Sequence, residues 1–166
     1  MITIIPQDDK LCVAETVKSI LEKQRKQQSR GCGCEGECKT SCMRKALGPI
    51  DFDGPNTIPF ILYCGCDPYK VEGVTTFFDP KCKKEKFLCF TTFIFRVKKV
   101  KDDCAVLELL KFKNHKCGSS KEHGHVCTPC CQLHCENVED LMPTGVCINT
   151  DLSCFCTIQC LPAIRI

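Results

Sequence analysis

Cysteine is the residue type that carries most of the chemistry available to this chain. It accounts for 19 of the 166 residues, about 11%, which exceeds the roughly 8–10% that marks a disulfide scaffold in short secreted chains. A cysteine can form a disulfide, bind a metal ion or act as a nucleophile. Because 19 is an odd number, at least one cysteine must stay a thiol or bond to another molecule.

Ten of these cysteines are candidates for disulfides between chains. Four lie in the segment GCGCEGECKTSC (31–42), whose Gly and short polar residues predict a flexible linker that can reach a neighbouring chain at little cost. Five lie in the Cys/His-rich segment 113–135, and one lies on the outward face of a predicted strand. The candidates are Cys32, Cys34, Cys38, Cys42, Cys147, Cys117, Cys127, Cys130, Cys131 and Cys135.

The clearest strand pattern spans residues 146–160, where even positions are mainly apolar and odd positions mainly polar. This alternation turns Cys147 outward and predicts three buried core thiols, Cys154, Cys156 and Cys160. Two of these, Cys154 and Cys156, start about 6.6–7 Å apart on one face, against about 3.8 Å between the Cβ atoms of a disulfide. They should therefore not bond to each other.

Zinc binding is the alternative use of the thiols. Cys127, Cys130, His134 and Cys135 have the ligand types and the short spacing of a tetrahedral site, and His123 and His125 add donors nearby. A Cys/His metal-binding module is therefore the alternative function.

The residues 127–130 also match a CxPC redox motif, which normally follows a strand that runs directly into a helix. Here the loop GSSKEHGH precedes the motif. We therefore assign no catalytic residue, and we expect neither an enzyme nor a bound cofactor.

The elements that position these residues are one helix followed by strands. Residues 9–28 carry Val13, Val17, Ile20 and Leu21 at three-to-four spacing, which predicts an amphipathic helix. From residue 57 onward, short apolar segments alternate with turn residues. FLCFTTFIFRV (87–97) is apolar at both parities, as in a strand covered on both faces. Six of the ten Phe lie in 77–95, which places the expected core there.

These patterns predict a mainly β fold, an antiparallel β-sandwich with an N-terminal helical arm and a Cys-rich linker. The expected units are 1–56, the N-terminal helix and Cys-rich arm, and 57–166, the β-sandwich core with the insert 113–135. Segment 104–112 is largely apolar and is compatible with a strand or a helix. The 15-residue pattern at 146–160 exceeds the usual strand length, so a bend is expected near Leu152–Ser153.

Composition argues against several partners. No stretch approaches the ~18–20 apolar residues that span a bilayer, so no membrane is expected. The start MITIIP lacks the basic and apolar regions of a secretory signal peptide. A net charge of +3 is too mild to suggest nucleic acid. Charge is nevertheless uneven, because residues 81–116 carry 11 basic and 4 acidic groups, while residues 117–166 carry 2 and 5. Such blocks are compatible with complementary surfaces for self-association or with ordinary solvated strand edges.

Three segments resemble the CotY/CotZ/ExsY family of bacterial endospore coat and exosporium proteins. They are NTIPFILY (56–63), IFRVKKVKDDCAVLELL (94–110) and CINTDLSCFCTIQCL (147–161), and the last is the most specific. The helix opening LCVAETVKSILEKQ is similar to the Cys-Val-led helix of that family. The likeness spans most of the chain but is interrupted at the insert 113–135.

The resemblance implies a structural protein that self-assembles into a disulfide-crosslinked two-dimensional array, often with hexameric units. It implies two kinds of partner, further copies of the chain and other spore coat or exosporium proteins. It also implies synthesis in the mother cell cytoplasm without a signal peptide, and oxidation as or after that cell lyses. Late oxidation would reconcile a cysteine-rich composition with a chain that lacks an export signal.

Overall fold

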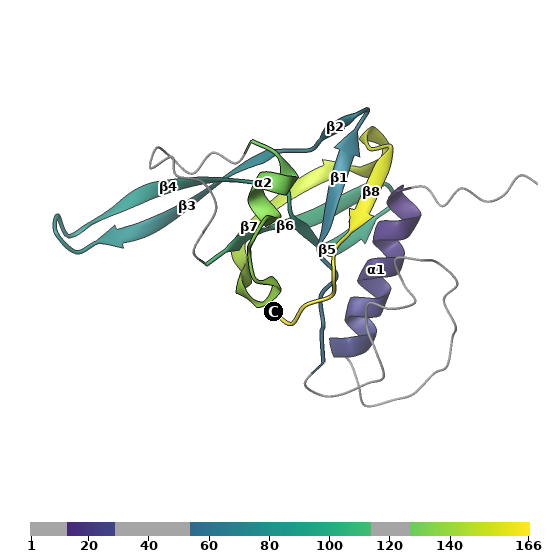
Figure 1. The fold of residues 1–166 in the computed structure, drawn as a ribbon, viewed down its shortest axis with the longest axis horizontal. Helices are drawn as coiled ribbons and strands as arrows, with labels where there is room; N and C mark the ends of the chain where they lie inside the picture. The colour runs from purple at the N-terminus through teal and green to yellow at the C-terminus, as the bar shows by residue number, and fades with distance from the viewer. Residues whose placement is uncertain (1–12, 29–53, 114–126) are drawn as a thin grey trace, which may run out of the picture.

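The computed structural model describes residues 13–28, 54–113 and 127–166. One long helix lies against a curved sheet, and a long hairpin projects from the opposite side of the molecule (Figure 1). The elements in chain order are α1 (Val13–Gln28), β1 (Phe60–Cys64), β2 (Asp67–Pro68), β3 (Val71–Asp79), β4 (Lys84–Thr92), β5 (Phe95–Lys101), β6 (Cys104–Phe112), α2 (Pro129–Leu133), η1 (Val138–Asp140), β7 (Leu141–Asp151), η2 (Leu152–Cys154) and β8 (Thr157–Cys160).

The strands form a six-stranded sheet and a separate two-stranded hairpin, and all their pairings are antiparallel. Strands β8, β1 and β2 make one layer, and β5, β6 and β7 make the other. The layers join where β1 meets β5, a contact with the single register pair Phe60–Phe95. Apolar side chains of both layers meet in one core. The prediction of a mainly β, antiparallel fold with an N-terminal helix is confirmed.

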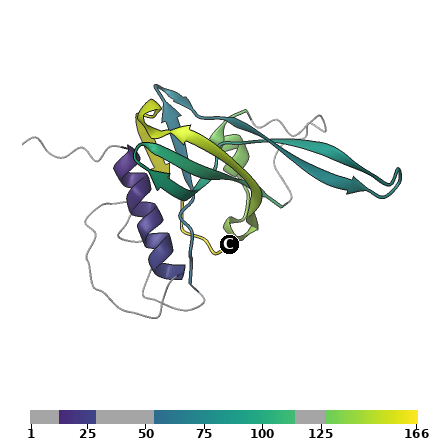
Figure 2. The ribbon, with the colours of Figure 1, turned by 180° about the vertical axis from the view of Figure 1, so that it is seen from behind.

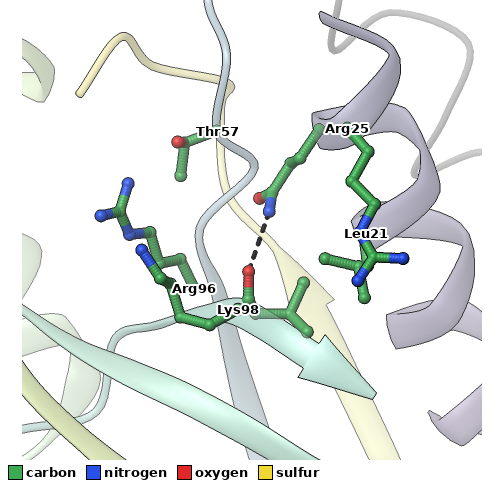
Figure 3. Close-up of a pocket in the computed structure, with 7 residues that line it drawn as sticks. Leu21, Arg25, Thr57, Arg96 and Lys98 are labelled. Atoms are coloured by element: carbon green, nitrogen blue, oxygen red, sulfur yellow. Dashed lines mark hydrogen bonds between the residues drawn. The ribbon is translucent and has the colours of Figure 1, made fainter. Parts of the chain in front are cut away.

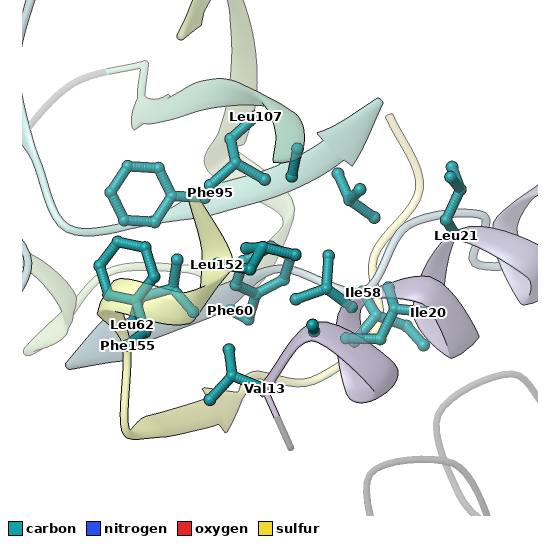
Figure 4. Close-up of a cluster of buried hydrophobic side chains, with 14 of the residues drawn as sticks. Val13, Ile20, Leu21, Ile58, Phe60, Leu62, Phe95, Leu107, Leu152 and Phe155 are labelled. Carbon is teal, nitrogen blue, oxygen red and sulfur yellow. The ribbon is translucent and has the colours of Figure 1, made fainter. Parts of the chain in front are cut away.

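Helix α1 covers the open side of this core. Val17 and Ile20 are fully buried, and Val13 and Leu21 are each 6% exposed. They pack with Ile58, Phe60 and Leu107 (Figure 4). Full burial of one such side chain contributes about 1.5–3 kcal/mol relative to exposure. The helical part of the predicted arm is thus part of the core, while the linker 31–42 lies outside the described residues.

Two buried glutamines fix the places where regular pairing stops. The side chain of Gln24 donates to the carbonyl of Val97 (3.0 Å) and accepts from the N–H of Ile58 (3.2 Å), which ties α1 to both layers. The side chain of Gln132 on α2 accepts from the N–H of Phe93 (2.9 Å) and donates to the hydroxyl of Thr92 (2.8 Å). Each bond satisfies a buried polar group that would otherwise cost about 1–3 kcal/mol.

The segment FLCFTTFIFRV is two strands, so the prediction of a single covered strand is wrong. The hydroxyl of Thr92 donates to the carbonyl of Leu110 and accepts from the N–H of Ile94, and these bonds stabilise a break between β4 and β5. The placement of the core within 77–95 is also only partly right. Phe93 and Phe95 are buried, whereas Phe77, Phe78 and Phe87 are exposed on the β3–β4 hairpin.

That hairpin extends far from the body in both views (Figures 1 and 2). Its base is fixed by the ring of Phe90, which lies directly over Gly73 and leaves no room there for a Cβ atom. The Nζ atom of Lys111 lies 5.4 Å from the centre of the same ring, a cation–π contact. The rest of the hairpin runs out from this anchored base.

The bend predicted near Leu152–Ser153 is confirmed. A 3-10 turn, η2, separates β7 from β8, and the carboxylate of Asp151 caps it by accepting from the N–H of Ser153 (2.9 Å). The turn places Leu152 and Phe155, three residues apart, on the core side. The strict alternation of two therefore ends at residue 152.

Candidate functional site: the exposed thiols

Exposure is the property that the cysteines of this fold share. Of the thirteen described cysteines, twelve are exposed thiols, and Cys160 is partly buried against the main core. Free cysteine is ordinarily among the residue types that folds bury most often. A set of twelve on the surface is therefore not explained by packing.

Five of the exposed thiols gather at one end of the sheet, on three neighbouring turns. The β1–β2 turn carries Cys64 and Cys66, and the Sγ atom of Cys156 lies 3.0 Å from the carbonyl oxygen of Gly65 in that turn. The η2 turn carries Cys154 and is joined to the β5–β6 turn by the bond from the N–H of Leu152 to the carbonyl of Asp103 (2.7 Å). The set is Cys64, Cys66, Cys104, Cys154 and Cys156.

The local sequence explains why these turns are tight. Gly65 adopts φ 62°, a left-handed conformation that favours glycine. Asp102 adopts φ 54° in the two-residue turn that closes β5 and β6, where Lys101 pairs with Cys104. Short polar side chains tolerate that conformation, so the Asp102–Asp103 pair forms the hairpin turn. A tight turn leaves its flanking side chains in solvent.

A second group surrounds α2, where Cys127, Cys130, Cys131 and Cys135 are all exposed. The hydroxyl of Thr128 accepts from the N–H of Cys131 (3.1 Å) and caps the helix, and Pro129 occupies its first turn. The Thr-Pro of the CxPC motif is therefore explained as a helix start. Cys135, which follows the C-cap residue His134, has φ 62°.

The zinc ligand set predicted from spacing is not assembled. All four residues, Cys127, Cys130, His134 and Cys135, are described and exposed, yet no group of three or more His, Cys, Asp or Glu within the described ranges could hold a metal ion. Cys127 precedes the N-cap of α2, Cys130 lies within the helix, and His134 and Cys135 lie at and beyond its C-cap. His123, His125 and Cys117 lie outside the described residues.

Three further exposed thiols stand apart from these groups. Cys82 is at the tip of the β3–β4 hairpin, and Cys89 is on β4 opposite Val74. Cys147 lies on β7 opposite Glu108 of β6, and its outward orientation was predicted correctly. Each of the three can meet another chain without any change in the core.

The predicted burial of Cys154 and Cys156 is wrong, because both are exposed. The alternation was extended through η2, and the 3-10 turn shifts the phase so that Phe155 faces the core instead. Cys160 is the one member of the predicted set that packs against the core.

Sequence reasoning also missed five exposed thiols, Cys64, Cys66, Cys82, Cys89 and Cys104. Four of them flank or occupy turns, and the turn residues Gly65, Lys83 and Asp102 were the signal that could have identified them. Cys89 gave no such signal, since it sits within an apolar run.

The main buried charge cluster of the described residues lies on β5 and β6. Glu108 is 4% exposed, and its Oε2 atom is 2.7 Å from the Arg96 guanidinium and 3.4 Å from the Lys98 ammonium. Its Oε1 atom accepts from the N–H of Gly145 (3.0 Å), which has φ 75° at an irregularity in the β6–β7 ladder. Burial alone would raise the pKa of Glu108, but the Arg96 hydrogen bond and charge, the Gly145 N–H and Lys98 together lower it.

Next to this cluster, a pocket of about 90 Å³ lies between α1 and β5 (Figure 3). Arg25, Arg96 and Lys98 contribute its charges, and the hydrogen bond from Gln24 to Val97 crosses it. Its lining residues include no carboxylate, thiol or imidazole, so the pocket itself offers no acid–base pair and no nucleophile. The surface thiols remain the chemically notable feature of the described chain.

Comparison with known proteins decides the family. The family model described as "Spore coat protein Z" matches residues 5–163. The chain belongs to the spore coat protein Z family. It is 30% identical over 150 residues to "Spore coat protein Z" of Bacillus subtilis (strain 168), covering 90% of this chain and 88% of that one. No solved structure matches. The resemblance to the CotY/CotZ/ExsY family is thereby confirmed, and a helix long and apolar enough to cross a membrane is not found among the described residues.

Proposed function

We propose that this spore coat protein is a structural subunit that assembles with its own copies into a two-dimensional sheet, which disulfides between chains then lock. Membership of the spore coat protein Z family supports a structural role in the coat rather than catalysis. The single observation that carries the proposal is the exposure of twelve of the thirteen described thiols. Thiols exposed on a folded monomer can meet those of another copy without any change in the core.

The crosslinking chemistry needs an oxidant, and we assign dioxygen to that role. A thiol on each of two copies loses its proton, the two sulfurs join, and the two electrons and two protons pass to dioxygen to give hydrogen peroxide. The reaction does not proceed while the surroundings are reducing. Synthesis in the mother cell cytoplasm followed by exposure to air after lysis supplies this order of events.

Non-covalent contacts set the geometry of the sheet before any disulfide forms. Individual contacts between copies can be weak, because each bound copy holds its neighbours at high effective concentration. A ring such as a hexamer closes and stops growing, so a tiled sheet needs a second interface as well. The disulfides then resist dilution, heat and denaturant at every contact at once.

The exposed thiols on the turns and around α2 extend the candidate crosslinkers beyond the linker. The linker thiols remain our first candidates, because the resemblance to the family is continuous there and broken across the insert. Other coat or exosporium proteins are the further partners, and the outer layers of the spore are the location. Exposed thiols on several sides of the fold support contacts with more than one neighbour.

Electron microscopy of the full-length recombinant protein tests the proposal. We expect ordered sheets or rings in reductant, and the same objects resistant to boiling in detergent after oxidation in air. Electrophoresis without reductant should retain this material at high molecular weight, and reductant should return it to the monomer. A chain that stays monomeric under both conditions would contradict the proposal.

A further inference from the structure

The β3–β4 hairpin presents an apolar surface that its own chain does not cover. Five of the six large hydrophobic residues that are strongly exposed in the described structure lie on it: Val74, Phe77, Phe78, Phe87 and Leu88. An isolated two-stranded hairpin is marginally stable at best in water. This one projects well beyond the body of the molecule (Figure 2). We call this hairpin the arm, as distinct from the N-terminal arm 1–56. It has the form of an element that becomes stable when another surface covers it.

One face of the arm is more exposed than the other. The register pairs Val74 with Cys89, Thr76 with Phe87 and Phe78 with Glu85, so these side chains share a face. On that face Val74 is 51% exposed, Phe78 61% and Phe87 79%. Phe77 and Leu88, on the opposite face, are 43% and 40% exposed. The face with Phe78 and Phe87, here called the arm face, exposes the larger apolar surface.

A complementary acceptor exists elsewhere on the same chain. An apolar pocket of about 90 Å³ lies between η1, β7 and the C-terminal segment, lined by Phe112, Leu133, Leu141, Leu161 and other residues. It includes Val138, the sixth strongly exposed hydrophobic residue, which is 50% exposed. A cavity of about 150 Å³ encloses benzene, so this open pocket takes part of one aromatic ring. We call it the η1 pocket.

The charges around the two surfaces are opposite in sign. The tip of the arm carries Lys81, Lys83, Lys84 and Lys86 against Asp79 and Glu85, a net charge of +2. Lys86 is held by Asp79 at 2.6 Å, which leaves the other three lysines toward solvent. Glu136 lines the η1 pocket, and Glu139 and Asp140 lie on η1; counting the nearby Lys113 and Arg165, these five residues carry a net charge of −1. Opposite potentials favour the encounter of these two surfaces.

We propose that the arm face of one copy docks into the η1 pocket of a second copy of this chain. The inference rests on the proposed self-assembly and names the interface that carries it. The contact is heterologous, because arm and pocket are different surfaces and every copy has one of each. If the contact is not returned between the same two copies, its repetition gives a closed ring or an open chain, whereas two copies that exchange arms close as a two-fold dimer. It also brings Cys82 and Cys89 of one copy to the surface of the next.

Two variants of the full-length chain test this directly in reductant, where no disulfide contributes. The arm variant is Phe78→Glu with Phe87→Glu, and the pocket variant is Val138→Lys. All three positions are at least half exposed, so circular dichroism and the thermal transition should match the parent. Sedimentation should show each variant associating at least thirtyfold more weakly than the parent, as for loss of a central interface residue. The matched control is Phe77→Glu, the same change on the opposite face, which should associate like the parent.

Mixing the two variants is the decisive step. The arm variant keeps an intact pocket and the pocket variant keeps an intact arm, so a 1:1 mixture should form a dimer that grows no further. If the contact were instead a two-fold contact between arms, mixing would not restore association, because the arm variant lacks the apolar arm face. A mixture that does not associate would therefore overturn the inference. Parent-like sheets from both variants would also overturn it while leaving the proposed function intact. A parent chain that stays monomeric would contradict both the arm–pocket interface and the proposed self-assembly.

Discussion

Replacement of Glu108 by Gln probes how the buried charge cluster stabilises the fold. One carboxylate oxygen of Glu108 lies 2.7 Å from the Arg96 guanidinium and 3.4 Å from the Lys98 ammonium. The other accepts a hydrogen bond from the N–H of Gly145 (3.0 Å). Gln can still accept from Gly145, but its amide group offers no charge to Arg96. A hydrogen bond to a charged group contributes about 1.5–3 kcal/mol, so we expect the free energy of unfolding to fall by about 2 kcal/mol. With a urea dependence of about 1–3 kcal/mol per molar, the midpoint falls by roughly 1 M.

The effect should depend on pH in a defined direction. The pKa of Glu108 is lower in the folded chain than its ordinary value of 4.5, because Arg96, Gly145 and Lys98 outweigh burial. The charged carboxylate therefore stabilises the fold above that ordinary value, and the contribution is lost as pH falls through the folded pKa. The difference in stability between the parent and Glu108→Gln should be constant near neutral pH and shrink below about pH 4.5.

Urea unfolding of the reduced protein at several pH values measures both effects. The matched control is Glu85→Gln, the same chemical change at an exposed position on the arm, which should leave the midpoint nearly unchanged. A Glu108→Gln chain as stable as the parent at pH 7 would refute the reasoning. So would a stability difference that grows as the solution is made more acidic.

Three other predictions concern the core and the thiols. Ile20→Ala should lower the free energy of unfolding by about 2–5 kcal/mol, measured by urea denaturation, because it opens a cavity under α1; a cost below 1 kcal/mol would mean that α1 is not docked. In mass mapping of native alkylation, Cys147, Cys154 and Cys156 should react quickly and Cys160 slowly; reaction of Cys154 and Cys156 as slow as that of Cys160 would contradict the phase shift at η2. Joint replacement of the four linker thiols by Ser should preserve the monomer fold and lower the resistance of oxidised sheets to boiling in detergent, as seen on gels without reductant; unchanged resistance would point to the insert instead. The replaced thiols are Cys32, Cys34, Cys38 and Cys42.

The sequence was most informative where one physical constraint acts over many residues. The spacing of Val17 and Ile20 predicted α1 because one helix face must avoid water over several turns. The alternation in 146–160 and its length predicted a bent strand for the same reason. In each case the signal is local and the constraint is repeated.

Prediction failed where a single residue changes the phase of a pattern. The η2 turn rotates the chain within three residues and exchanges the positions of Cys154 and Phe155. In the same way, Thr92 bonds to Leu110, eighteen residues away, and divides an apolar run into two strands. The acceptor that stabilises the break is distant in sequence, so no local pattern marks it.

The exposure of Phe78 and Phe87 illustrates a further limit. A run of apolar residues has the same sequence pattern whether the surface that covers it belongs to its own chain or to another copy. The structure removes this ambiguity, because the described chain brings no second layer against the outer part of β3 and β4. A sequence pattern of complete burial on an exposed arm is therefore itself a sign of intermolecular contact.

The positions of the thiols suit a division of labour between fold and crosslink. A disulfide requires its two Cβ atoms to approach to about 3.8 Å, and a thiol on a tight turn can make this approach without disturbing the strand ladder. Cys64, Cys66 and Cys104 sit at such turns, whereas the arm and the η1 pocket supply apolar surface and opposite charge. Weak, reversible contacts can then correct errors in register while the thiols are reduced. In the sheet that we propose, oxidation would then fix whichever neighbours the contacts have selected, so the non-covalent interfaces would set its order and the disulfides its durability.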